Sequence, residues 1–244
     1  MKYMINGAMG YMGREVLKLL GTRKPEIEVI LVDVNADCES ILTSPTDCKE
    51  KIDCIIDFSH HSATKTLTDY AVSTATPLVL ATTGQTPEEL AMIENAAKKI
   101  PVFFASNMSL GIAVLIRMAK EAAKAFPDAD IEIVETHHNR KLDVPSGTAL
   151  TIGKALQTVR PDAVLNIGRH ENGKRAKKEI DIHSLRMGNV VGIHEVHICT
   201  QTQTITLRHE AHDRSLFAEG AIDAAKFLDR KPAGLYNMEN LLGE

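Results

Sequence analysis

The sequence predicts an α/β protein in which a Rossmann-like, doubly wound parallel sheet is followed by a second α+β domain. Three observations predict this fold. A short apolar strand near the N-terminus runs directly into a glycine-rich loop and a helix. Strand-like and helix-like segments then alternate as far as residue 126, which is typical of a parallel sheet with helices on both faces. Beyond residue 178, three strands follow one another, which indicates a sheet of a different type.

The N-terminal segment carries a glycine loop in the context that binds a dinucleotide. Residues 3–6 read as a strand, residues 14–20 have helical apolar spacing, and between them lies Gly7-Ala8-Met9-Gly10-Tyr11-Met12-Gly13. Glycines permit the tight turn and let the backbone approach a pyrophosphate at the helix N-terminus. The spacing differs by one residue from the commonest fingerprint, and a βα turn without a ligand would have the same appearance.

The second predicted strand, residues 27–32, ends at Asp33. A carboxylate at this position accepts hydrogen bonds from the adenine-ribose hydroxyls and repels a 2′-phosphate. The next residue is Val34, which cannot bind such a phosphate. We therefore expect NADH in preference to NADPH, unless the fold brings Arg14, Lys49 or Lys51 close to this position.

Further strands are expected at residues 52–58, 77–81 and 101–105, and helices at residues 61–74 and 87–99. Ligands of parallel sheets bind at the carboxyl ends of the strands. Small or hydroxylated residues occupy these ends, at Ala81-Thr82-Thr83 and at Ala105-Ser106-Asn107-Met108. They suit a nicotinamide ring and its ribose. His60 and His61 are interpreted as loop residues.

A long helix from Ser109 to Phe126 marks the domain crossing. After it we expect a strand at residues 131–134, a helix at 147–159, a polar loop, and strands at 179–187, 193–200 and 204–209, the last two forming a hairpin. A helix at 215–228 should return to the first domain. The dinucleotide domain would then comprise residues 1–107 plus 216–244, and the substrate and oligomerisation domain residues 108–215. An open sheet needs its exposed face covered, for which oligomerisation is the expected means.

Residues 134–149 concentrate the groups suited to chemistry. His137 and His138 lie at the end of a strand and should point to opposite faces, so they do not indicate a shared metal ion, and no metal site is expected. Arg140 and Lys141 follow them and would hold an anionic group, leaving one histidine to transfer a proton. Adjacent histidines that are merely solvated would fit the same pattern.

The same stretch continues into a predicted helix start. Proline disfavours a helical conformation in the residue before it, and Ser146 is a favourable N-cap. The amides and partial positive charge of a helix start bind carboxylates, and Gly147 would let one approach closely. These features indicate a small dianionic ligand, although a capped turn without a ligand would look alike.

Composition excludes several classes of function. The net charge of −4 argues against a general nucleic-acid binder, and the basic run at residues 169–178 is expected to be an exposed loop. No apolar run approaches the roughly 20 residues needed to cross a membrane, and no signal-peptide pattern is present. The four cysteines lack Cys-x-x-Cys spacing, so a cytoplasmic location is expected.

These motifs resemble the dihydrodipicolinate reductase family, the 4-hydroxy-tetrahydrodipicolinate reductases of bacterial lysine biosynthesis. The similarity runs over nearly the whole chain, and its most specific part is Glu135 to Ala149. Other matching motifs are the Gly7–Gly13 loop, Thr82-Thr83-Gly84, Asn107-Met108-Ser109-x-Gly111, and Arg186-x-Gly188 with Val191-Gly192-x-His194. The segment between Asp33 and Ile52 is shorter than is usual in the family.

The resemblance implies a homotetramer that transfers a hydride from NADH or NADPH to 4-hydroxy-tetrahydrodipicolinate, an unsaturated cyclic imine dicarboxylate, in lysine and diaminopimelate biosynthesis. It implies that His137 donates the proton with Lys141 as its partner. It also implies that the substrate is bound by His138, Ser146, Gly147 and Thr148. The implied cofactor-binding residues are Gly7, Ala8, Met9, Gly10, Tyr11, Met12, Asp33, Ala81, Thr82, Thr83, Ala105, Ser106, Asn107 and Met108.

Three other classes of protein could share parts of this pattern. An aldehyde dehydrogenase of the amino-acid semialdehyde type needs a cysteine nucleophile, and the strand of Cys199 lacks an obvious base. A serine hydrolase needs a Gly-x-Ser-x-Gly turn, which residues 144–148 do not supply. A dinucleotide-sensing regulator would keep the fold and bind the cofactor without turnover.

Overall fold

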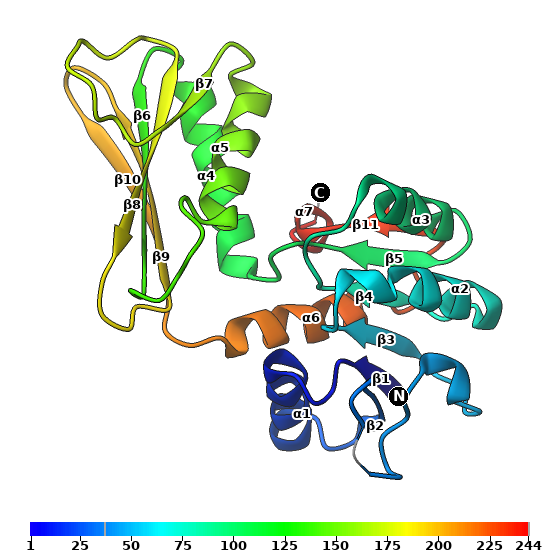
Figure 1. The fold of residues 1–244 in the computed structure, drawn as a ribbon. Coiled ribbons are helices and arrows are strands. Elements are labelled where there is room, and N and C mark those ends of the chain that lie inside the picture. Colours follow the sequence, from blue (N-terminus) through cyan, green and yellow to red (C-terminus); the bar gives the residue numbers. More distant parts are fainter. Residues whose placement is uncertain (37, 244) are drawn as a thin grey trace. The chain divides into compact units, whose positions relative to one another are not determined.

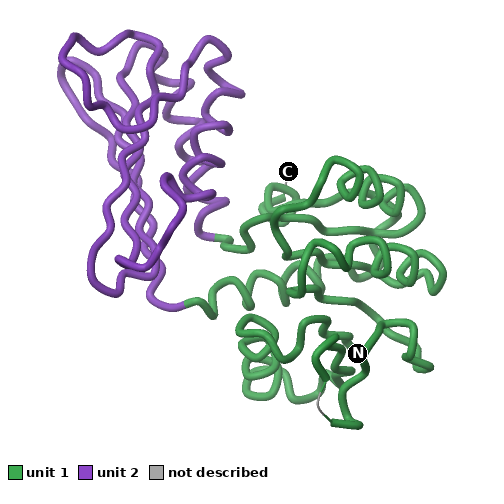
Figure 2. The backbone as a smooth tube through the Cα atoms, viewed as in Figure 1, with its two compact units in different colours: residues 1–110, 214–244 green, residues 111–213 purple. Residues whose placement is uncertain are grey.

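The computed structural model describes residues 1–36 and 38–243 of the chain. It divides into two compact units, residues 1–110 with 214–244 and residues 111–213 (Figure 2). The sequence placed these divisions at 107/108 and 215/216. The predicted fold class is confirmed, because the first unit contains a parallel sheet between helices and the second a mixed sheet (Figure 1).

Unit 1 is built on six parallel strands in the order β11-β5-β4-β3-β1-β2. The strands are β1 (Lys2–Asn6), β2 (Glu28–Val32), β3 (Cys54–Asp57), β4 (Leu78–Leu80), β5 (Pro101–Phe104) and β11 (Gly234–Tyr236). The helices are α1 (Tyr11–Arg23), α2 (Thr64–Thr74), α3 (Pro87–Ala97), α6 (Ser215–Phe227) and α7 (Met238–Leu241), with short 3₁₀ turns η1 (Pro45–Asp47) and η2 (His61–Ala63). The strand order reverses between β1 and β3, which is where sheets of this kind bind ligands.

The faces of this sheet are covered by separate helix pairs. Alternate residues of each strand point to opposite faces, and one face packs against α2 and α3 through a core that includes Met4, Leu67 and Ile93. The helices α1 and α6 contact each other, and α6 contacts β3 and β4 (Figure 1). A Cβ at Gly220 of α6 would lie 1.8 Å from the carbonyl oxygen of Met108. The expected return of the 215–228 helix to the first unit is therefore confirmed, and its close packing there requires glycine.

Unit 2 contains a five-stranded mixed sheet in the order β10-β9-β6-β8-β7. Its strands are β6 (Asp130–His137), β7 (Val164–Ile167), β8 (Glu179–Arg186), β9 (Gly192–Cys199) and β10 (Thr204–Ala211). The helices α4 (Leu110–Ala125) and α5 (Gly147–Val159) cover one face (Figure 1). The core between them includes Leu115, Ile131, Ile133, Ile152 and Ile182. The predicted hairpin is confirmed, because β9 and β10 pair in antiparallel register.

Besides the turn η1, three elements were not predicted. Strand β7 lies within the stretch expected to be a polar loop, while β11 and α7 follow the last predicted helix. All three are short, and β7 and β11 are edge strands with mostly exposed or half-buried side chains, so they lack the apolar alternation that identifies longer strands. Among the described residues, no helix has both the length and the apolar character needed to cross a membrane.

Candidate functional site

The glycine loop of unit 1 is shaped by close backbone approaches. Gly7 has a φ of +77°, and a Cβ there would lie 2.8 Å from the amide nitrogen of Ser59. A Cβ at Gly13 would lie 2.2 Å from the carbonyl oxygen of Gly7. Only glycine fits these two positions, so the loop passes tightly between the end of β3 and the start of α1. This is the geometry that lets a pyrophosphate reach a helix N-terminus.

Asp33 is tied to this loop as well as to its own turn. One carboxylate oxygen accepts from the Met9 amide at 2.9 Å, and the other accepts from the Asn35 amide at the same distance. The side chain is buried. A carboxylate has about four lone-pair sites, so these two bonds leave room for ribose hydroxyls. Asp33 therefore holds the loop in addition to any role in binding a ribose.

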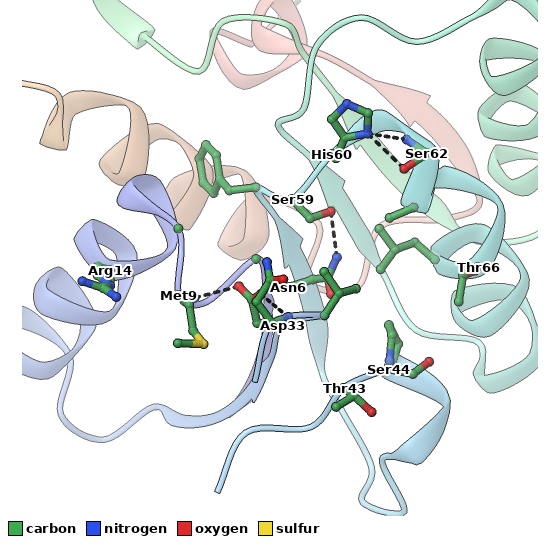
Figure 3. Close-up of a pocket in the computed structure, with 18 residues that line it drawn as sticks. Asn6, Met9, Arg14, Asp33, Thr43, Ser44, Ser59, His60, Ser62 and Thr66 are labelled. Atoms are coloured by element: carbon green, nitrogen blue, oxygen red, sulfur yellow. Dashed lines mark hydrogen bonds between the residues drawn. The ribbon is translucent and has the colours of Figure 1, made fainter. Parts of the chain in front are cut away.

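A pocket of about 810 Å³ opens beside the loop. Of the predicted cofactor residues, Gly7, Met9, Gly10 and Asp33 line it. Figure 3 shows Met9 and Arg14 on the α1 side and Thr43 and Ser44 on the segment that follows β2. Among the described residues, the lining does not include Ala8, Tyr11, Met12, Ala81, Thr82, Thr83, Ala105, Ser106, Asn107 or Met108. The cofactor-binding roles of these ten residues, and of the four that line the pocket, stay predictions.

The segment after Asp33 forms a pocket wall without a helix of its own. Ser44 begins the turn η1 with a capping box, in which its side chain accepts from Thr46 and the Asp47 carboxylate accepts from the Ser44 amide. Sequence reasoning missed this wall. The Ser-Pro-Thr-Asp run carries the signal, since Ser, Pro and Asp are typical of successive N-terminal positions of a helix.

The ends of β1 and β3 are joined by a buried carboxylate. Asp57 accepts from Asn6 Nδ2 at 2.8 Å and from Ser59 Oγ at 2.6 Å. Burial raises the pKa of Asp57, against these hydrogen bonds, which lower it. The network fixes the floor of the pocket, where Asn6 and Ser59 both line it (Figure 3). His60, interpreted from the sequence as a loop residue, also lines the pocket and caps the turn η2.

A second set of polar groups lies in unit 2 at the end of β6. Glu135 has no exposed surface, and its Oε2 lies 2.5 Å from Nδ1 of His137. Arg186 on β8 binds both oxygens of the same carboxylate, at 2.9 and 2.7 Å. Burial raises the pKa of Glu135, but the hydrogen bonds from His137 and Arg186 outweigh it and hold that pKa well below its ordinary value. Glu135 is therefore a carboxylate anion between two cationic or hydrogen-bonding partners.

The predicted helix start is present and is anchored to this carboxylate. Ser146 is the N-cap of α5, with its Oγ accepting from the Ala149 amide at 3.2 Å. Its own amide donates to Glu135 Oε1 at 3.1 Å. Gly147 is exposed, and a Cβ there would meet no atom within 4 Å. Ser146 thus stabilises the turn through two buried hydrogen bonds, while Gly147 and the half-buried Thr148 lie on its outer surface.

A third histidine, His194 on β9, completes the cluster. Its ring lies edge-on to that of His137, with centroids 5.2 Å apart, and its Nε2 lies 3.2 Å from Ser146 Oγ. Burial, with a contribution from the neighbouring His137, lowers the pKa of His194 to about 3. His194 is therefore neutral near pH 7.

The remaining predicted residues lie on the segment between β6 and α5. Lys141 Nζ forms an ion pair with Asp143 at 2.8 Å, and Arg140 donates to Asn189 at 2.6 Å. His138 is half-buried, in contrast to the buried His137. His137 and Ser146 thus belong to one hydrogen-bond network. Lys141 lies on a neighbouring segment, which Arg186 joins to that network by donating to the Asp143 carbonyl at 2.8 Å.

Sequence reasoning assigned no role to Glu135, Arg186 or His194, although all three belong to matched motifs. The spacing of Glu135 and His137 carries a signal, because residues two apart on a strand share a face. Arg186 and His194 lie about 50 and 60 residues further along the chain, so only the sheet brings them close. Their pairing across β6, β8 and β9 could not be read from the local sequence.

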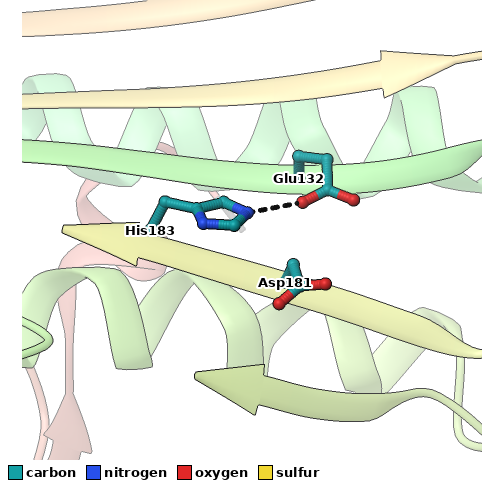
Figure 4. A group of neighbouring side chains, drawn as sticks. All are labelled: Glu132, Asp181 and His183. Atoms are coloured by element: carbon teal, nitrogen blue, oxygen red, sulfur yellow. Dashed lines mark hydrogen bonds and ion pairs between the residues drawn. The ribbon is translucent and has the colours of Figure 1, made fainter. Parts of the chain in front are cut away.

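The other notable polar cluster is on the open face of the second sheet. Within the described part of the chain, Glu132, Asp181 and His183 are the one group with atoms close enough to share a metal ion (Figure 4). Arg175 donates to Glu132 at 3.0 Å, and Arg169 donates to Asp181 at 3.1 Å. These guanidinium groups balance the charge of the carboxylates, as a bound metal ion would. The basic run at 169–178 is a loop, as expected, and its arginines bind this face.

The fold and the glycine loop place the chain in the class of two-unit proteins with a Rossmann-type N-terminal unit. Two family models match it: "Dihydrodipicolinate reductase, N-terminus" over residues 1–108 and "Dihydrodipicolinate reductase, C-terminus" over residues 111–242. The chain belongs to the dihydrodipicolinate reductase family.

Curated relatives and a solved structure agree with this assignment. A 4-hydroxy-tetrahydrodipicolinate reductase of Caldanaerobacter subterraneus subsp. tengcongensis is 44% identical, covering 99% of this chain and 98% of the relative. One from Alkaliphilus metalliredigens is 40% identical, covering 100% and 99%. The structure of a dipicolinate-bound dihydrodipicolinate reductase from Paenisporosarcina sp. TG-14 superposes with a TM-score of 0.82 at 24% identity, covering 98% of each chain. The last likeness bears on the fold alone.

Proposed function

We propose that this protein is a 4-hydroxy-tetrahydrodipicolinate reductase, which reduces a cyclic imine dicarboxylate with a reduced pyridine nucleotide in lysine biosynthesis. One observation carries the proposal. This chain, a member of the family, has a buried histidine–carboxylate pair, His137 and Glu135, directly beside the capped start of α5. Conversion of the 4-hydroxy substrate to tetrahydrodipicolinate consumes one hydride and one proton and releases water. The protein must therefore bind a dianion, orient it, and supply the proton.

The residues of unit 2 divide these tasks. His137 is the proton donor, and Lys141 provides the positive charge that stabilises the anion formed by hydride addition. Gly147 and Thr148, in the first turn of α5, receive one substrate carboxylate, and Ser146 holds that turn in place. His138 contacts the substrate from the other side of the strand end. This arrangement accounts for a substrate with two negative charges.

The residues of unit 1 fit a pyridine nucleotide, which supplies the hydride when bound. The cradle at Gly7 and Gly13, which any Cβ would fill, is the observation that supports the fit. The NADH preference follows from Asp33, whose buried carboxylate repels a 2′-phosphate, while Arg14 in the same pocket wall limits that preference. The roles assigned to Ala81–Thr83 and Ala105–Met108 rest on their place at the strand ends.

The assembly that we propose is a homotetramer formed through the open face of the second sheet. The helices α4 and α5 cover only one face, and the other carries paired charges such as Glu132–Arg175. Sedimentation of the purified chain tests this proposal. A monomer at micromolar concentration would contradict it.

The activity is tested by following the loss of NADH and NADPH absorbance with the purified chain and the pathway imine. Turnover with both the imine and the cofactor present, and none with either omitted, is the expected result. Binding of NADH without turnover would favour a dinucleotide-sensing regulator and would reject the proposed function. The ratio of kcat/KM for the two cofactors tests the preference for NADH.

A further inference from the structure

We propose that Glu135, clamped by Arg186, is a positioning residue that fixes the ring of His137 so that Nε2, and not Nδ1, delivers the proton. This inference rests on the proposed function, since it concerns the acid of that reaction. It assigns a task to two residues to which the proposed function gives no contact with the substrate or the cofactor.

The contacts of Glu135 leave it a single orientation. Residues 135 and 137 point to the same face of β6, and the carboxylate takes one bond from His137, two from Arg186 and one from the Ser146 amide. A carboxylate has about four acceptor sites, so all of them are used. Because the side chain has no exposed surface, water cannot replace any of these partners. The position of Nδ1 is therefore set by a saturated, rigid acceptor.

This geometry decides which nitrogen is free. A neutral imidazole carries one hydrogen, and the hydrogen bond at one nitrogen sets the tautomer. With Nδ1–H donated to Glu135, the protonated ring carries its transferable proton on Nε2. In the reaction that Nε2–H bond breaks, a new bond to hydrogen forms on the reduced substrate, and the electron pair stays on Nε2. The ring ends as the neutral Nδ1–H tautomer, with Glu135 unchanged.

The surroundings of Nε2 support this assignment. A Cβ at Gly192 would lie 3.1 Å from Nε2, so the glycine keeps that side of the ring unobstructed. The same Glu135 carboxylate binds the Ser146 amide, and Arg186 also donates to the Asp143 carbonyl. One buried carboxylate thus holds His137 and the capped helix start directly, and holds the segment that carries Lys141 through Arg186.

The first test is the tautomer of His137, read by nitrogen-15 NMR of the histidine rings in the full chain. His137→Gln assigns the signals. In the native chain we expect the neutral ring to be the Nδ1–H tautomer, and in Glu135→Gln a mixture of tautomers. An Nε2–H tautomer in the native chain would overturn the proposal, as would an unchanged ring in the variant. The native measurement decides the question even if the variant fails to fold.

The second test is a double-mutant cycle in kcat. We expect Glu135→Gln to lower kcat by about 10- to 100-fold, as is usual when the partner that orients a functional histidine is removed. In a His137→Gln background the same change should cost less, because the part of the loss that acts through that ring is already absent. Equal losses in both backgrounds would mean that Glu135 only stabilises the fold, and would overturn the proposal.

Glu132→Gln is the matched control. Glu132 lies on the same strand and also accepts from an arginine, Arg175, and faces a histidine, His183, but on the open face of the sheet. Its substitution should leave kcat and the His137 tautomer unchanged, with assembly checked by sedimentation. If the native chain did not reduce the imine, the proposed function would fail, while the tautomer measurement would still decide whether Glu135 orients the ring.

Discussion

Ser146 Oγ lies 3.2 Å from Nε2 of His194, and both side chains are buried. The same oxygen accepts from the Ala149 amide as the cap of α5 and shares a further hydrogen bond with His194. Burial lowers the pKa of His194 to about 3, so the ring is neutral near pH 7. The helix start assigned to the substrate carboxylate is therefore built on an uncharged histidine.

Acidification should expose the cost of keeping His194 neutral. Burial lowers the pKa of His194 from 6.5 to about 3. Between these values the unfolded chain binds a proton that the folded chain does not, so the free energy of unfolding falls as pH falls through this window, by up to about 1.4 kcal/mol per pH unit. Above about pH 6.5 this contribution is constant.

Denaturant unfolding of His194→Gln at several pH values measures that contribution. The variant should be less stable than the native chain near pH 7, yet lose less stability between pH 6.5 and 4, because it lacks the titrating ring. His197→Gln, on the same strand but with a side chain 31% exposed, is the matched control. Parallel pH profiles for the native chain and His194→Gln would contradict the assignment.

His137→Gln should lower turnover while substrate still binds. Loss of a positioned acid typically costs about 10²- to 10⁴-fold in rate, whereas the carboxylate seat at α5 is untouched by this change. Steady-state kinetics gives the turnover, and calorimetry with dipicolinate gives the binding. Near-normal kcat in the variant would reject His137 as the acid.

Much of the fold could be predicted because its signals are local. The glycine loop, the alternation of strands and helices up to residue 126, and the cap at Ser146 each depend on residues close together in sequence. The helix predicted at 147–159 has those bounds in the structure. The short strands β7 and β11 were not predicted, because an edge strand of three or four half-exposed residues has no distinctive sequence pattern.

The site was predicted only in part, for the same reason. His137, Lys141 and Ser146 lie within ten residues of one another and could be read as a group. Arg186 and His194 join them through the pairing of β6 with β8 and β9, which the sequence does not reveal. The sequence therefore indicated the candidate reacting residues together, but not the residues that hold them in place.

Lys141→Ala should impair both substrate binding and turnover, because the ammonium group is assigned to an anion that gains charge during the reaction. We expect KM to rise and kcat to fall, each by at least about tenfold. Arg140→Ala is the informative comparison, since its guanidinium binds Asn189 at 2.6 Å. If Arg140→Ala caused the larger loss, the cation of the site would be Arg140. A defect in the KM for the cofactor alone would contradict both assignments.

Gly192→Ala tests whether space beside His137 matters. The added Cβ would lie 3.1 Å from Nε2, a contact that is relieved only if the ring moves, and Glu135 prevents that. We expect kcat to fall by about tenfold or more with little change in the KM for NADH, since a small displacement of a reacting group has a large effect on rate. Gly21→Ala, in α1, where the Cβ would meet no atom within 4 Å, controls for the loss of a glycine. Full activity in Gly192→Ala would show that Nε2 is not the reacting atom.

Asp33→Asn should shift cofactor preference and also weaken binding of both cofactors. Loss of the charge removes the repulsion of a 2′-phosphate, so the ratio of kcat/KM for NADPH over NADH should rise by about tenfold, or about 1.4 kcal/mol. Asn keeps one acceptor oxygen for the two amides of Met9 and Asn35 that the carboxylate now binds, so the glycine loop loses a contact. Adding Arg14→Ala to this variant should reverse the shift, because Arg14 is the cation in the same pocket wall. A preference that did not change in Asp33→Asn would place the 2′-position of the cofactor away from this carboxylate.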